Sequence, residues 1–327
     1  TEQCGLNVKR LNLRVAANRN QCTLENFSLQ TAHSRLSLDT IHFRYDAHRD
    51  LSHLLKTLNV RGQIPQATIS THDLAYFVPR LRGLDQEIRL ATHYNVSPQR
   101  IDVQLIDLRN AQQSLALHGN FSILRKQGVV QDIVGHVQHL SLDNALGQRL
   151  FALTQSPHHP TPAPQWLGHL GNLVVMGQGQ YSLKGQSHFK GQAMSQLGLL
   201  NVDLRHRDAT IGGEISSAAF QPSLLQLHDW MPSTLHFTAK GEVTLMPKAL
   251  PAGQVDLNIK QVTLRGQTYH NLHAQASLHQ QRAAVKFDID DPAAQLQLEA
   301  AAQLAPNWQP SGLSASMAVT RFQPAAL

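Results

Sequence analysis

Cysteine is nearly absent from this sequence of 327 residues, which holds two, Cys4 and Cys22. A small scaffold held together by several disulfides is therefore excluded. A hairpin that turns near residues 18–20 would place Cys4 opposite about position 36, so we expect no disulfide between the two cysteines. Two thiols are too few for a cysteine-rich zinc cluster, and the 19 histidines form no His-Glu-x-x-His motif. We predict neither a metal site nor a cofactor.

Charged and aromatic side chains are also scarce. Charged residues make up 15% of the sequence and aromatic residues 6%, whereas about a quarter of a typical globular domain is charged. The net charge of +6 permits an anionic partner, but the basic residues are scattered singly or in short groups such as 80–82 and 205–207. Recognition of nucleic acid requires a basic stripe interleaved with aromatic residues, and the sequence has none. We predict no nucleic-acid partner.

Long apolar runs are missing as well: no stretch approaches the roughly 20 apolar residues that a membrane-spanning helix needs. Apolar and polar residues alternate instead, which gives a strand one apolar face. One alternating unit recurs with two adjacent polar residues at its centre, at residues 6–13, 22–29, 137–142 and 257–264. The extra polar residue would turn the later apolar positions to the other face, unless a β-bulge absorbs it. The recurrence therefore predicts bulged strands that build one long apolar surface.

Strands are predicted for most of the chain. Further alternating runs occupy residues 101–105, 115–123, 200–205, 285–289 and 295–299. Turn residues separate these runs at short intervals, so neighbouring strands should pair antiparallel as a meander. Helical patterns are few and short, near residues 71–78, 142–151 and 223–230. The predicted fold class is mainly β, an elongated and twisted antiparallel sheet that curls into an apolar groove, with a few short helices.

The chain also contains a longer repeat. Residues 64–90 and 213–238 both read as strand, short amphipathic helix and strand, about 150 residues apart. Between them, residues 155–165 are rich in proline and hold no charged side chain, which is typical of a linker. We expect a first β module over residues 1–154, a linker over 155–165 and a second module over 166–327 that is truncated at its C-terminus.

These patterned segments resemble the AsmA-like superfamily, and most closely its TamB branch of translocation and assembly module proteins, of the Bacteroidota type. Residues 24–38, the module 64–90 with its helix at 73–77, and the Gly-led unit 135–140 carry the resemblance. It rests on degenerate repeats over nearly the whole chain. It implies a hydrophobic β-groove in a protein that is anchored in the inner membrane and crosses the periplasm of a Gram-negative envelope.

The same resemblance implies a function and partners. AsmA-like proteins are associated with phospholipid transport between the inner and outer membranes and with outer-membrane protein assembly. Phospholipid acyl chains would then be the ligand, and an outer-membrane barrel of the TamA/Omp85 type would be the partner of the full-length protein. The membrane anchor and the region that meets the barrel are expected outside these residues.

Lining residues for such a groove are predicted from the alternating runs. Each methylene group buried against an aliphatic wall is worth about 0.8 kcal/mol, so acyl chains would be held strongly. The candidates are Val103, Leu105, Leu115, Leu117, Phe121, Val202, Leu204, Leu257 and Ile259. The same side chains could pack in a dry core, and a structural β-solenoid or adhesin-type stalk with a closed apolar core is the alternative function.

Catalysis has little support in the sequence. Ser187 and Lys190 match a Ser-x-x-Lys pattern, but that chemistry needs the serine at the start of a helix. Here the pattern falls in an alternating, strand-like region. We predict that the chain is not an enzyme.

Overall fold

The computed structural model describes residues 6–46, 56–154, 164–183, 185–246, 250–305 and 308–322. Contacts divide the chain into two compact units, Thr1–Gly168 with Asn172–Lys184, and His169–Gly171 with Gly185–Leu327. Cys4 and residues 155–163 of the predicted linker lie outside the described residues. The expectation that the chain contains two copies of one module stays a prediction.

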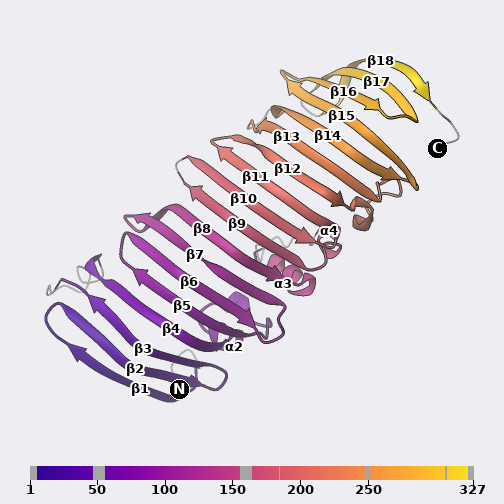
Figure 1. The fold of residues 1–327 in the computed structure, drawn as a ribbon. Helices are drawn as coiled ribbons and strands as arrows, with labels where there is room; N and C mark the ends of the chain where they lie inside the picture. The colour runs from indigo at the N-terminus through magenta and orange to yellow at the C-terminus, as the bar shows by residue number, and fades with distance from the viewer. Residues whose placement is uncertain are drawn as a thin grey trace. The chain divides into compact units, whose positions relative to one another are not determined.

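The described residues of the first unit form nine antiparallel strands, each hydrogen-bonded to the next along the chain (Figure 1). Short turns join most of them, because turn residues interrupt the alternation at those points. The strands are β1 (Val8–Ala17), β2 (Gln21–Thr31), β3 (Arg35–Arg44), β4 (Asn59–Ser70), β5 (Glu87–Val96), β6 (Arg100–Asn110), β7 (Leu115–Lys126), β8 (Val129–Leu142) and β9 (Leu173–Ser182).

The part of the second unit that the structure describes has nine strands in the same antiparallel, sequential order. They are β10 (Gln186–Ser195), β11 (Gly198–Arg207), β12 (Thr210–Phe220), β13 (Thr234–Thr244), β14 (Ala252–Leu264), β15 (Gln267–His279), β16 (Arg282–Asp290), β17 (Ala294–Leu304) and β18 (Pro310–Phe322). The predicted mainly β, antiparallel fold is confirmed, because the alternating runs all fall within these strands.

Several connections of the meander contain short helices. The connection from β4 to β5 holds α2 (Thr71–Leu74) and the 3-10 helix η1 (Pro79–Leu81). The connection from β8 to β9 holds α3 (Asn144–Thr154) and α4 (Gln165–Gly168). The connection from β12 to β13 holds the 3-10 helix η2 (Pro222–Leu225). In each unit we call the strand end at these connections the helical end and the opposite one the turn end. Among the described residues, no helix has the length and apolar character that crossing a bilayer requires.

Two of the predicted helices are shorter than expected. The helix predicted over residues 71–78 stops at Leu74, and a turn then leads into η1 at Pro79. The helix predicted over 223–230 is a single 3-10 turn, because Gln226 adopts a left-handed conformation (φ 53°) directly after it. The helix predicted over 142–151 is α3, which begins at Asn144 instead.

Each recurring strand unit contains the predicted bulge. In all four units the strand register shifts at the central polar pair. One residue of each pair is therefore skipped in the pairing with a neighbouring strand. The extra residues are Lys9 in β1, Asn26 in β2, Gln138 in β8 and Lys260 in β14. The bulges thus return the apolar residues on both sides of each polar pair to the same face of the sheet.

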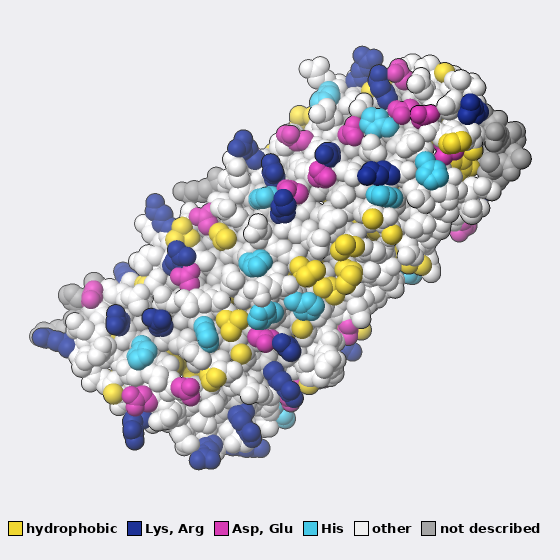
Figure 2. All heavy atoms as spheres, viewed as in Figure 1, with side chains coloured by type: hydrophobic (Ala, Val, Ile, Leu, Met, Phe, Trp, Pro, Cys, Tyr) yellow, Lys and Arg dark blue, Asp and Glu magenta, His cyan; other side chains and the backbone are white. Residues whose placement is uncertain are grey.

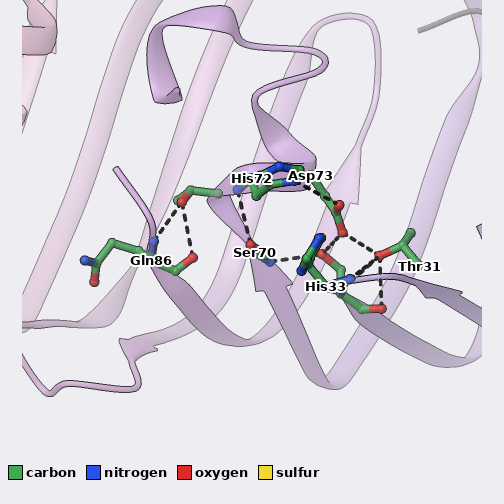
Figure 3. A network of polar contacts seen from close by, with 8 residues as sticks. Thr31, His33, Ser70, His72, Asp73 and Gln86 are labelled. Atoms are coloured by element: carbon green, nitrogen blue, oxygen red, sulfur yellow. Dashed lines mark hydrogen bonds and ion pairs between the residues drawn. The ribbon is translucent and has the colours of Figure 1, made fainter. Parts of the chain in front are cut away.

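A buried carboxylate joins α2 to the turn between β2 and β3 (Figure 3). The hydroxyls of Thr31 and Ser34 both donate hydrogen bonds to Asp73 Oδ2. The hydrogen bond from Ser34 Oγ has a length of 2.5 Å. Burial by itself would raise the pKa of Asp73. The two hydroxyls, together with the nearby imidazoles of His33 and His72, outweigh that effect and hold this pKa below its usual value.

Replacement of Asp73 by Asn is expected to lower the free energy of unfolding by about 2 kcal/mol at neutral pH, because two charge-assisted hydrogen bonds are lost. Because the pKa of Asp73 is lower in the folded chain, its stabilising contribution is fully present above the pKa of the carboxyl in the unfolded chain. The contribution is lost as the pH falls through the pKa of the folded chain. Urea titrations of wild type and Asp73→Asn at neutral pH and near pH 3 measure this, and the difference should shrink in acid. Asp85→Asn, an exposed change in the same connection, is the control. If the free energies of unfolding of wild type and Asp73→Asn differ by the same amount at both pH values, the lowered pKa of Asp73 is contradicted.

Candidate functional site

The first unit has one continuous apolar face. Strand β7 alternates without interruption from Leu115 to Ile123, and residues that are paired across antiparallel strands share a face. The register can therefore be followed outward from β7 in rows that cross all nine strands. The Leu117 row consists of Leu11, Leu29, Leu36, Ala67, Leu90, Leu108, Leu117, Leu140 and Val175.

Two further rows run beside it toward the turn end, again with an apolar residue or glycine on every strand. The Phe121 row consists of Val15, Leu24, Ile41, Gly62, Tyr94, Val103, Phe121, Gly135 and Gly179. The Ile123 row consists of Ala17, Cys22, Phe43, Val60, Val96, Ile101, Ile123, Ile133 and Tyr181.

The second unit has an apolar face of the same kind. Its Val202 row consists of Gly191, Val202, Ile215, Ala239, Leu257, Ala274, Phe287, Leu298 and Met317. Its Leu204 row consists of Phe189, Leu204, Gly213, Gly241, Val255, Ala276, Val285, Ala300 and Ala315. A third row, nearer the helical end, consists of Ser217, Phe237, Ile259, Leu272, Ile289, Leu296 and Val319.

The register brings eight of the nine predicted lining residues onto these faces. Seven of them belong to the rows, and Leu115 lies opposite Leu142, one step from the Leu117 row toward the helical end. Leu105 is the exception. The bulge at Gln104 places it opposite His93, outside the rows, whereas Val103 lies opposite Tyr94 and Phe121.

In the part of the chain that the structure describes, neither apolar face has a second layer. Among the described residues no second sheet is stacked on either unit, and each strand packs mainly along its sequence neighbours. The helices lie in connections at the strand ends. Leu117 and Val202 are half-buried, and Val255 and Val285 are 40% and 41% exposed. Neighbouring strands thus provide most of the burial, which leaves part of each apolar side chain open to solvent.

The opposite face of the second unit is polar and paired. Its central row consists of Lys190, Asp203, Glu214, Lys240, Asp256, Gln275, Lys286, Glu299 and Ser316. Ion pairs link Lys240 Nζ to Glu214 at 3.1 Å and Lys286 Nζ to Glu299 at 2.9 Å. Figure 2 shows charged and histidine side chains spread over the face turned to the viewer. Exposed pairs contribute little stability, but they keep this face wet.

Histidines take part in the same polar face. His188 Nε2 lies 2.8 Å from Asp203 Oδ1, and this hydrogen bond lowers the pKa of Asp203. His273 Nε2 lies 2.9 Å from Asp256, and that hydrogen bond, helped by the charges of Asp256 and Asp288, raises the pKa of His273. These contacts tie both histidines to carboxylates of the same face.

Chemistry-bearing clusters are few. Ser187 and Lys190 lie in the extended strand β10, not at the start of a helix. Within the described ranges, no group of three or more His, Cys, Asp and Glu side chains is placed to hold a metal ion. The apolar faces are therefore the strongest candidate sites.

One residue of the first apolar face was missed by sequence reasoning. Arg125 continues the alternation of β7 two residues beyond Ile123, which places it at the turn end of the apolar face. The predicted alternating run ended at Ile123, and every predicted lining residue is apolar. The unbroken period of two is the signal that could have found it.

No family model, curated protein or solved structure matches this chain. The resemblance to AsmA-like proteins therefore stays a prediction. The function has to be argued from the geometry of the apolar faces.

Proposed function

We propose that this chain is a segment of an AsmA- or TamB-like envelope protein whose apolar faces carry phospholipid acyl chains between the inner and outer membranes. The observation that supports the proposal is the set of apolar rows that cross all nine strands of a unit without a charged side chain. A core that only stabilises a fold needs no such continuity.

The length of the rows suits transport better than a single binding pocket. Strands lie about 4.8 Å apart, so eight intervals span roughly 38 Å. One bilayer leaflet has a hydrocarbon depth of about 15 Å, half of the roughly 30 Å core, so a row is longer than one acyl chain. A lipid would find similar aliphatic contacts at each position along the row.

The uncovered state of the faces supports the same proposal. Large contiguous apolar patches that remain exposed normally mark interaction sites. An acyl chain gains about 0.8 kcal/mol for each methylene group that it buries there. Contacts of this kind have no preferred direction, so a chain can move along a row without breaking hydrogen bonds. The periplasmic location and the TamA-type barrel partner belong to this proposal through the resemblance alone.

Photo-crosslinking tests the proposal directly. A benzophenone amino acid is placed at Leu117 or Val202 on the apolar faces, and the purified chain is irradiated with phosphatidylglycerol–phosphatidylethanolamine vesicles. Ala116 and Asp203 are the matched controls, since each is the sequence neighbour of its test residue and lies on the polar face. We expect phospholipid adducts at Leu117 and Val202 and few at the controls. Equal yields on both faces, or none, would favour the closed structural stalk.

A further inference from the structure

Arg125 is the exceptional residue of the apolar faces. Among the paired apolar-face positions of the described strands in both units, it is the only Asp, Glu, Lys or Arg. It lies opposite Val130, next to the turn end of the Ile123 row. A charge at this border departs from a pattern that excludes charge everywhere else on these faces.

The guanidinium of Arg125 is only partly satisfied. Its Nη2 donates a hydrogen bond of 2.5 Å to the carbonyl oxygen of Ser97. Its Nε is buried and has no hydrogen-bond partner, and no described carboxylate forms an ion pair with it. Arg125 therefore carries a half-buried positive charge with a free donor.

An uncompensated buried donor and charge are costly, and an anion can remove both costs. The planar guanidinium donates two parallel hydrogen bonds, a geometry that matches the oxygens of a phosphate. At the border of an apolar face, the anion would be attached to a hydrophobic tail. The acyl chains would lie on the rows, and the phosphate would lie at the turn end, where water has access.

We propose that Arg125 binds the phosphate group of a phospholipid whose acyl chains lie on the first unit's apolar face. The site would then prefer phosphate-bearing lipids over uncharged acylglycerols. This inference rests on the proposed function, because it assumes that acyl chains occupy the face. A purely structural role for Arg125, as a brace for the turn that contains Ser97, predicts no such preference.

The test compares phosphatidic acid and diacylglycerol that carry the same photoreactive acyl chain. Wild type should be labelled by phosphatidic acid at least about tenfold more efficiently, the effect of one charge-assisted contact. Arg125→Gln should lose this preference while diacylglycerol labelling stays unchanged, and Arg125→Lys should retain part of it. Lys126→Gln removes the same charge one residue away, on the other face, and should keep the preference. Excess inorganic phosphate should not displace the lipid.

A second measurement does not depend on the folding of a variant. Phosphatidic acid, and not diacylglycerol, should protect Arg125 of the wild-type chain from modification by phenylglyoxal. If neither lipid labels wild type, the proposed function is overturned. If both lipids label wild type equally, or if Arg125→Gln keeps the preference, only the assignment of Arg125 is overturned.

Discussion

Replacing Leu117 by Asp is expected to reduce phospholipid transfer by at least about tenfold, because every passing acyl chain would have to displace water from a carboxylate. Leu117 lies in the middle of a nine-strand row, opposite Leu108 and Leu140. A fluorescent phospholipid that moves between donor and acceptor vesicles measures the transfer rate. The side chain is half-buried, so the strand can keep its pairing with the carboxylate turned toward solvent.

The matched control is Ala116→Asp, which places the same charge on the polar face between Arg109 and Ser141. Circular dichroism should show native β structure for both variants. The control should transfer lipid as wild type does. If Leu117→Asp folds and transfers lipid normally, the rows are not the path and the proposed lining is wrong.

Replacing Gly213 by Ala is expected to destabilise the second unit by about 3 kcal/mol, by combining backbone strain with a steric overlap. Gly213 has a φ of 151°, which L side chains rarely adopt, and an added Cβ would overlap the backbone carbonyl oxygen of Asp203. That oxygen belongs to β11, which pairs with β12 along this stretch. The methyl group can be accommodated only if the two strands move apart.

Gly212→Ala provides the comparison. Its Cβ would lie 3.2 Å from the carbonyl oxygen of Gly241, a contact that a small shift relieves. The loss of backbone freedom in the unfolded chain would also favour alanine slightly. Urea unfolding should therefore show a change below about 1 kcal/mol for Gly212→Ala. Equal effects of the two substitutions would refute the steric explanation.

Local alternation predicted the strands well, because the opposite directions of successive side chains are a property of the extended backbone itself. The two adjacent polar residues at Lys260 and Gln261 predicted a bulge for the same reason. Helices were predicted less accurately. The apolar spacing after Thr71 looked helical, but Leu74 ends α2, and the following residues form a turn that leads to Pro79.

The candidate site could be predicted only in part. Leu117 and Val202 were found from alternation alone, but Leu105 was assigned to the same face as Val103 because the bulge at Gln104 was not foreseen. Gln104 lies between Val103 and Leu105, so no pair of adjacent polar residues marks this bulge. Arg125 was missed because the predicted lining residues were chosen among apolar side chains only.

The sequence by itself determined that the chain forms many amphipathic strands with bulges at recurrent polar pairs, since both depend on neighbouring residues only. The tertiary structure alone decided which residues line up across nine strands, because register accumulates from every turn and bulge, and a slip of one residue reverses a face. Within the described ranges, it alone left the apolar faces without a second layer and placed Arg125 at the border of one of them. Those long-range arrangements, which no local pattern contains, carry both proposals.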